Sequence, residues 1–136
     1  MNNSKRYLPK DKEDVEFVNY LKMMNIEDII SDIPILLEWL QDGNWLQAQL
    51  ITQYLLPNVN IIKSDIIDIL RGGDEMWKYW VLNGLLSDTN KKLDNEILIE
   101  IERLYLNPSE DEKEVEVNLI AYSILKNNNY PAAQSL

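Results

Sequence analysis

The stretch Leu36–Trp45, with the sequence LLEWLQDGNW, ends one apolar helix and begins the next. Gly43 would supply the left-handed residue that ends the first helix, and Asn44 would cap a second helix that Pro57 stops. Because so short a connection joins them, the two helices should form an antiparallel hairpin over residues 26–56. The first helix has its apolar residues at the three-four spacing of one wide helical face: Ile26, Ile29, Ile30, Ile33, Leu36, Leu37 and Leu40.

The same plan recurs twice downstream of this corner. A second helix pair turns at Gly72-Gly73, where Asp74 would cap its second helix, and a looser third pair turns over residues 107–109. Trp45 and Trp77 follow equivalent corners and are 32 residues apart. That spacing is close to the period of stacked two-helix repeats.

These elements predict one all-α domain over residues 1–136, with an N-terminal helix and three antiparallel helix pairs stacked as a short right-handed solenoid of HEAT-like repeats. The N-terminal helix should cover residues 12–24 with Asp11 as its N-cap, after a lead-in over residues 1–11. Residues 127–136 should form a frayed tail. A compact seven-helix bundle with accidental spacing is the alternative, and it is also all-α.

Two residues inside the predicted helices need a structural reason. Pro34 removes one backbone hydrogen bond, so we expect the first helix of the first pair to kink or restart there. Gly84 follows Trp77 and Trp80, which we assign to the core, and it costs about 1 kcal/mol of helix propensity. The close approach of a neighbouring helix would explain a residue without a side chain at this position.

The chain of 136 residues carries a formal net charge of −10, and the charge is unevenly spread. Residues 25–60 hold five acidic side chains and no Lys or Arg. Such a surface disfavours nucleic acids and anionic membranes, and it favours a basic protein partner. No apolar run approaches the roughly 18 residues of a membrane span, and the first residues lead into charge. We therefore expect a cytoplasmic protein.

The residue inventory argues against catalysis. The chain has no histidine and no cysteine, which removes the commonest general base, thiol nucleophiles and thiolate metal sites. It also has no glycine-rich phosphate loop or dinucleotide fingerprint, so we expect no cofactor. The acidic run over residues 110–116 lacks the glycine turn of a calcium loop, and Ser109 with Glu112 forms a capping-box pattern instead. We therefore expect a protein that is not an enzyme and binds no metal.

Four motifs carry a family resemblance. They are LPKD at residues 8–11, LLEWLQD followed by NW at 36–45, WKYWVL at 77–82 and NPSE at 107–110. Together they resemble the signature of a small bacterial family of unknown function that is similar to HEAT-like helical repeats. The resemblance covers nearly the whole chain and implies no activity and no catalytic residue. The chain departs from the pattern at Leu46, where such families usually have proline after the corner tryptophan.

The family resemblance leaves the function unknown. From the residues themselves we predict a non-catalytic protein–protein interaction module with an acidic surface. Trp39 lies off the strict apolar line and beside two carboxylates, so Glu38, Trp39 and Asp42 are the predicted partner contacts. A narrower alternative is an immunity-type acidic inhibitor of a basic toxin or nuclease. A carboxylate-dependent hydrolase is the competing class, because pairs such as Glu38 and Asp42 could act on a glycosidic bond.

Overall fold

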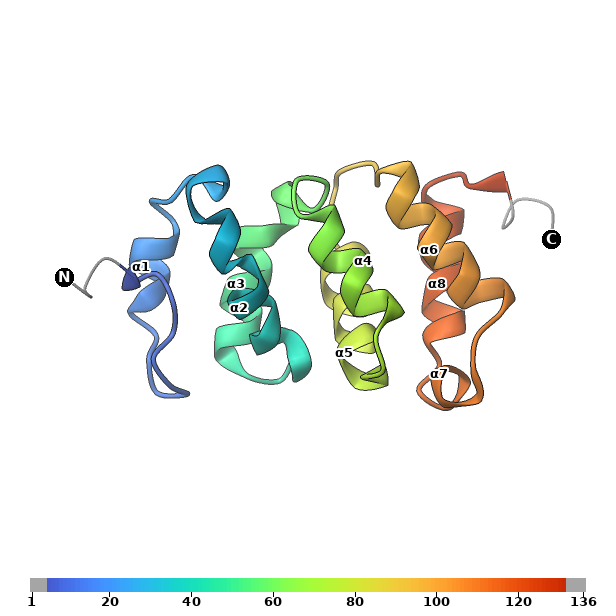
Figure 1. The fold of residues 1–136 in the computed structure, drawn as a ribbon, viewed down its shortest axis with the longest axis horizontal. Coiled ribbons are helices and arrows are strands. Elements are labelled where there is room, and N and C mark those ends of the chain that lie inside the picture. Colours follow the sequence, from blue (N-terminus) through green and yellow to red (C-terminus); the bar gives the residue numbers. More distant parts are fainter. Residues whose placement is uncertain (1–4, 132–136) are drawn as a thin grey trace.

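The computed structural model describes residues 5–131, and every regular element within that range is helical (Figure 1). The all-α prediction is therefore confirmed. The α-helices are α1 (Phe17–Leu21), α2 (Ile33–Glu38), α3 (Leu46–Leu55), α4 (Lys63–Arg71), α5 (Glu75–Trp80), α6 (Asn95–Leu106), α7 (Glu110–Glu114) and α8 (Val117–Asn127). Between them lie the 3-10 helices η2 (Ile26–Asp32), η3 (Trp39–Gln41) and η4 (Leu56–Asn58), and the π-helix η5 (Val81–Leu86).

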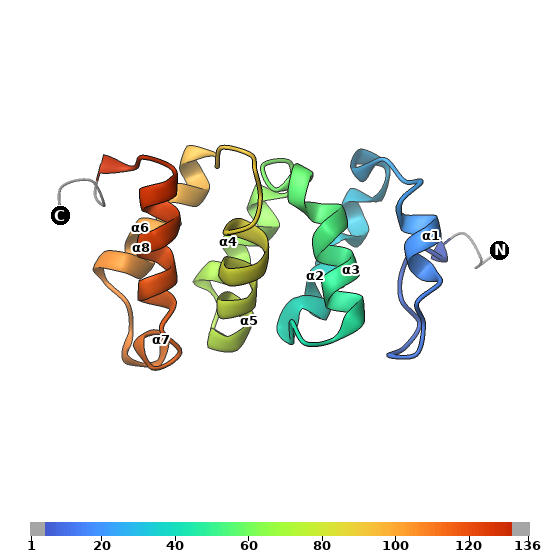
Figure 2. The ribbon, with the colours of Figure 1, turned by 180° about the vertical axis from the view of Figure 1, so that it is seen from behind.

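The helices follow one another in chain order along an elongated molecule (Figure 1). α2, α4 and α6 lie in one layer, and Figure 2 shows α3, α5 and α8 in the layer behind them. Burying each Leu or Ile side chain contributes about 1.5–3 kcal/mol to stability. Fully buried side chains from both layers form a continuous core that includes Ile33, Leu36, Ile51, Leu70, Leu85, Ile101, Ala121 and Ile124. Within the described part of the chain, no helix is long and apolar enough to cross a membrane.

The corner after α2 differs from its prediction. Gly43 is not left-handed, since none of the chain's described glycines has a positive φ. Its role is steric. A Cβ at Gly43 would overlap the indole ring of Trp80, the last residue of α5. Asn44 is also not the cap of α3. Trp45 takes the extended N-cap position, and the Asn44 N–H donates to Asp42 Oδ1 at 2.9 Å.

The predicted helix over residues 12–24 is also wrong in its bounds, since only α1 forms. Buried Gln47, which is 1% exposed, donates through Nε2 to the carbonyls of Lys12 (3.0 Å) and Asp14 (2.7 Å). These two carbonyls therefore accept hydrogen bonds from a distant side chain and lie outside any helix. The N-cap of α1 is Glu16 and not Asp11, and it makes no side-chain cap bond. Asp14 Oδ1, two residues before this N-cap, accepts from the Phe17 N–H at 3.2 Å.

The lead-in and the tail are both held against the helices where the structure describes them. The buried Tyr7 hydroxyl donates to Asp32, which attaches the lead-in to η2. Beyond α8, Asn128 Oδ1 accepts from the Leu93 N–H at 3.1 Å, and the Tyr130 hydroxyl donates to Glu102 at 3.1 Å. Residues 132–136 of the predicted frayed tail lie outside the described range.

The predictions for Pro34 and Gly84 have opposite outcomes. A non-helical Ile29 interrupts η2, and Pro34 then lies in the first turn of α2, so the expected restart is confirmed. At Gly84 the expected close approach is wrong, because a Cβ there would have no atom within 4 Å. Gly84 instead lies within the π-helix η5, where the Ser87 N–H donates to the Leu82 carbonyl at 2.9 Å.

Candidate functional site: a groove between α2 and α4

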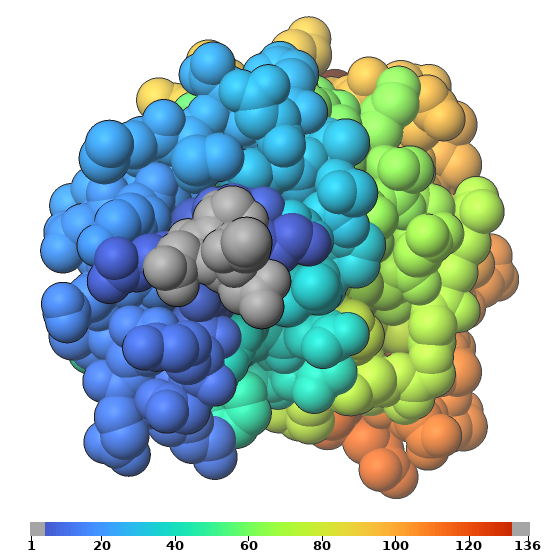
Figure 3. All heavy atoms as spheres, turned by 60° about the vertical axis from the view of Figure 1, so that its left-hand side comes forward, coloured from blue at the N-terminus to red at the C-terminus, as the bar shows by residue number. Residues whose placement is uncertain are grey.

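A groove with a volume of about 300 Å³ opens between α2 and the corner that joins α4 to α5. Figure 3 shows the cyan atoms of α2 beside the green atoms of α4 on this side of the molecule. The floor is mainly apolar, and its side chains are Pro34, Leu37, Ile69 and Trp77. The rim is acidic and consists of Glu38 from α2, Asp65 and Asp68 from α4, and Asp74 at the corner. We call the floor and the rim together the α2–α4 groove.

Trp77 fixes the geometry of the α2–α4 groove. Its indole Nε1 donates to the Leu37 carbonyl near the end of α2, at 2.9 Å. Its backbone N–H donates to Asp74 Oδ1 at 3.0 Å, which is the cap predicted for α5 and confirmed here. The indole bond holds the ring against the end of α2, and the backbone bond caps the start of α5, so the ring lies between these two helices.

The rim carboxylates lack cationic partners within residues 5–131. None of Glu38, Asp65, Asp68 or Asp74 forms an ion pair with a described Lys or Arg. Burial raises the pKa of half-buried Asp65, and the charge of Asp68 raises it further. The α2–α4 groove therefore presents uncompensated negative charge beside an apolar floor.

The next junction along the molecule, between α4–α5 and α6–α7, is built differently. It also has an open cavity, of about 560 Å³, but its three acids face three cations. Lys78 Nζ lies 2.6 Å from Glu112 Oε2, and both side chains are only 3% exposed. The complete set is Glu75, Glu100 and Glu112 with Arg71, Lys78 and Arg103.

Glu112 is the centre of this ionic cluster. Burial by itself would raise the pKa of Glu112, but hydrogen bonds from Arg103, Lys78 and the Ser109 backbone outweigh burial and hold it at about 2. The Ser109–Glu112 capping box predicted from the sequence is confirmed, and it positions the Glu112 carboxylate. A buried carboxylate with this many donors stays ionised at neutral pH.

The two junctions have one equivalent hydrogen bond each, but the residue that donates it differs. Leu37 and Leu70 are 33 residues apart, and the carbonyl of each accepts a hydrogen bond from a side chain of the following helices. The donor to Leu37 is Trp77 Nε1, and the donor to Leu70 is Arg103 Nη2 at 3.1 Å. An arginine therefore compensates the acids at the second junction, and a tryptophan occupies the corresponding place at the first.

A comparison with protein families identifies the family of this chain. The sequence model described as "Domain of unknown function (DUF5071)" matches residues 7–125, which include both junctions. The chain belongs to the DUF5071 family. Among curated proteins, no relative matches this sequence. The resemblance to a family of unknown function is confirmed, and the family description assigns the DUF5071 domain no activity.

The structure separates the three predicted partner contacts of this DUF5071 domain. Glu38 lines the α2–α4 groove. Trp39 packs edge-on against Trp45, with ring centroids 5.7 Å apart and an interplanar angle of 71°. Asp42 accepts a hydrogen bond from the Asn44 backbone. Consecutive helical residues point about 100° apart, so Glu38 and Trp39 occupy different faces.

Of the four rim carboxylates, only Glu38 was predicted from the sequence as a partner contact, and Asp65, Asp68 and Asp74 were not. Asp65 and Asp68 are three residues apart on α4, a spacing that places both on one helix face opposite the buried Ile66 and Leu70. That pattern was the available signal, although it does not reveal which helix lies across from it. Trp77, assigned to the core, does pack against the core but is only half-buried and also lines the groove.

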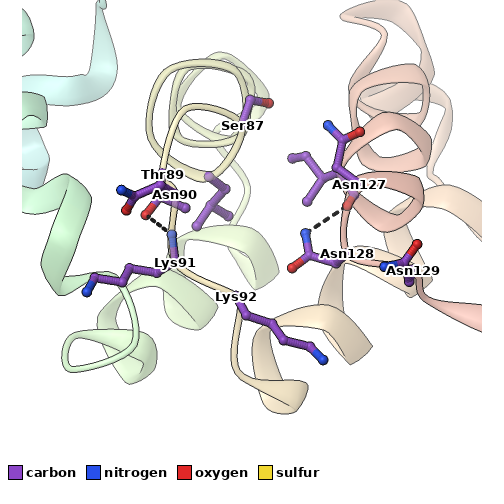
Figure 4. Close-up of a pocket in the computed structure, with 10 residues that line it drawn as sticks. Ser87, Thr89, Asn90, Lys91, Lys92, Asn127, Asn128 and Asn129 are labelled. Carbon is purple, nitrogen blue, oxygen red and sulfur yellow. Dashed lines mark hydrogen bonds between the residues drawn. The ribbon is translucent and has the colours of Figure 1, made fainter.

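A third cavity, of about 310 Å³, lies between the loop after η5 and the end of α8 (Figure 4). Hydroxyl and amide side chains dominate its lining, and several are used internally. Asn128 Nδ2 donates to the Ile124 carbonyl at 2.9 Å, and Thr89 Oγ1 accepts from the Lys91 N–H at 3.2 Å. The Lys91 side chain extends away from Asn127 and Asn128. The Leu93 N–H also donates to Asn128 Oδ1 and so attaches the segment after η5 to the end of α8. Because these polar groups hold the fold together, we favour the α2–α4 groove as the candidate site of the DUF5071 domain.

Proposed function

We propose that this domain is a non-catalytic protein-binding module whose α2–α4 groove accepts a basic segment of another protein. One observation carries the proposal. Each acid of the second junction has a cation from the same chain, whereas the rim acids Glu38, Asp65, Asp68 and Asp74 have none among the described residues. A partner would supply the missing positive charge.

The composition of the groove suits such a segment. Long basic side chains combine an apolar stem with a charged end, which matches an apolar floor below an acidic rim. The net charge of −10 would attract a basic partner over a longer range and raise its association rate. An immunity-type inhibitor of a basic toxin or nuclease would be a special case of this proposal.

A short HEAT-like solenoid of antiparallel helix pairs is the scaffold that we propose for this groove. The order of the helices in two layers supports it, as does the 33-residue offset between the Leu37 and Leu70 carbonyl bonds. In solenoids each pair contacts only its neighbours, so the junctions between pairs form surface grooves.

A carboxylate-dependent hydrolase is the second candidate, and one observation favours it. The groove contains two neighbouring acids, and the pKa of Asp65 is raised by burial and by Asp68. Such an acid could protonate a leaving group while a second carboxylate assists. We place this candidate second because Asp65 and Asp68 project from one helix, and Glu38 on the opposite wall is exposed to solvent, whereas a glycosidic bond is held between two opposed carboxyl groups in a closed site.

Binding of a labelled basic amphipathic peptide, followed by fluorescence anisotropy, tests the proposal. The groove variant is Asp65→Asn with Asp68→Asn, and the matched control is Asp88→Asn with Glu114→Gln. The control removes the same charge at exposed residues outside the groove. We expect the groove variant to lose about tenfold or more in affinity and the control to lose much less. Equal losses in both variants, or no binding by the wild type, would contradict the proposal.

The same variants separate the two candidates. Incubating the wild type with a panel of chromogenic glycosides would reveal hydrolysis if the second candidate is correct. Loss of that hydrolysis in the groove variant, together with retained activity in the control, would favour the hydrolase over the binding module.

A further inference from the structure

We infer that the α2–α4 groove takes an arginine side chain from the bound partner. This inference rests on the proposed function and names the residue that the groove selects. It comes from comparing the two junctions within the molecule, because the second junction already holds an arginine and the first has similar surroundings without one.

Arg103 shows how a junction of this fold binds a guanidinium group. Its Nη2 donates to the Leu70 carbonyl at 3.1 Å and lies 3.2 Å from Glu112 Oε2. Its Nε donates to Glu100 Oε1 at 3.2 Å. One helix-end carbonyl and two carboxylates from different elements therefore hold one planar cation.

The first junction presents carboxylates from two helices without a cation. The Leu37 carbonyl, which corresponds to that of Leu70, already accepts from Trp77 Nε1, but carboxylates stand on both walls, Glu38 on α2 and Asp68 on α4. Carboxylates on separate walls suit a guanidinium, whose five N–H donors point in several directions. The ammonium of lysine is more compact and more strongly hydrated.

The floor adds a second preference for arginine. The half-buried ring of Trp77 lines the groove, and the hydrogen bond from its Nε1 to the Leu37 carbonyl fixes its orientation. Arginine stacks on aromatic rings and is more weakly hydrated than an ammonium, so an apolar floor costs it less. A metal ion fits less well, because no described group of three or more acidic side chains is arranged to hold one.

The test uses three peptides that are identical except at one central position, which is arginine, lysine or citrulline. Two flanking lysines keep all three peptides basic. Citrulline has the shape of arginine without its charge, so it isolates the ionic contribution. Each peptide is titrated into the full-length wild type, into Asp68→Asn and into Glu38→Gln, with Asp88→Asn as the control for charge. Circular dichroism and thermal melting check that every variant is folded.

We expect the wild type to bind the arginine peptide about five- to tenfold more tightly than the lysine peptide, and the citrulline peptide most weakly. The preference should shrink in Asp68→Asn and in Glu38→Gln and persist in Asp88→Asn. Equal binding of the arginine and lysine peptides, still weakened by Asp68→Asn, would overturn the arginine inference and leave the proposed function standing. Absence of binding by all three peptides would overturn both.

Discussion

The indole nitrogen of Trp77 on α5 donates a hydrogen bond to the carbonyl of Leu37 on α2 at 2.9 Å, and this bond joins the two helices at the α2–α4 groove. The two residues are 40 positions apart in the chain. The bond closes the floor of the groove and leaves the acidic rim above it open to solvent. Trp77 therefore contributes both to packing between helices and to the groove that we propose as a binding site.

Replacing Trp77 with phenylalanine should remove this bond while keeping an aromatic ring. We expect the free energy of unfolding to fall by about 1 kcal/mol, the usual net value of one hydrogen bond. Urea denaturation followed by circular dichroism would measure the change. Trp39→Phe is the matched control, because no hydrogen bond from the Trp39 indole is found among the described residues. A loss as large in Trp39→Phe as in Trp77→Phe would contradict this role.

Replacing Lys78 with methionine should be much more damaging than an average charge deletion. The variant leaves Glu112 buried with one cation fewer, and breaking a buried ion pair costs about 3–5 kcal/mol. The matched control is Lys113→Met, whose ion pair with Glu110 is exposed and should be worth roughly 0–1 kcal/mol. The double variant Lys78→Met with Glu112→Leu should recover part of the loss. Similar unfolding free energies for the two single variants would refute the prediction.

The stability of the domain should depend on pH through Glu112. Its pKa is about 2 in the folded protein against 4.5 ordinarily, so the unfolded chain takes up the proton first as the pH falls. The contribution is therefore complete above about pH 5 and is lost progressively as the pH falls toward about 2. Denaturation at a series of pH values should show a shallower acid decline in Glu112→Gln. The pKa of Asp32 is also lowered, chiefly by the hydrogen bond from the Tyr7 hydroxyl. The stability of the Glu112→Gln variant should therefore still fall to some extent in acid.

Two glycine substitutions should have opposite effects. A methyl group at Gly43 would overlap the Trp80 ring, so Gly43→Ala should destabilise the fold by about 1–3 kcal/mol. At Gly73 the φ is not positive and a Cβ would meet no atom within 4 Å, so Gly73→Ala should be neutral or add roughly 0.4–1 kcal/mol. Melting temperatures of both variants check this, and a destabilised Gly73→Ala would count against the described geometry of the corner.

Features decided within a few residues were predictable from the sequence. The caps at Asp74 and Ser109 and the restart at Pro34 each depend on contacts within one helical turn, and all three are confirmed. Features decided by distant residues were not. Gln47 binds the carbonyls of Lys12 and Asp14, which precede α1, and Trp80 explains why Gly43 is a glycine. Both depend on helices that meet only in the folded chain.

The candidate site follows the same division. Glu38 was selected from the sequence and lies in the groove, because its exposure follows from the helical period of α2. Asp65 and Asp68 were not selected, because their significance depends on which helix packs opposite α4. Trp39 and Asp42 were grouped with Glu38 by sequence proximity, although the turn of the helix directs the three side chains to different surroundings.

The most direct test of the binding site is to follow the indole N–H signals of the four tryptophans by nuclear magnetic resonance while the arginine peptide is added. A groove occupied by the peptide should shift the Trp77 signal, and the shift should saturate with the affinity measured by anisotropy. The Trp39 and Trp45 signals should stay in place, because neither residue lines the groove. A saturating shift of Trp39 or Trp45 with Trp77 unchanged would show that the peptide binds elsewhere and would contradict the assignment of the α2–α4 groove.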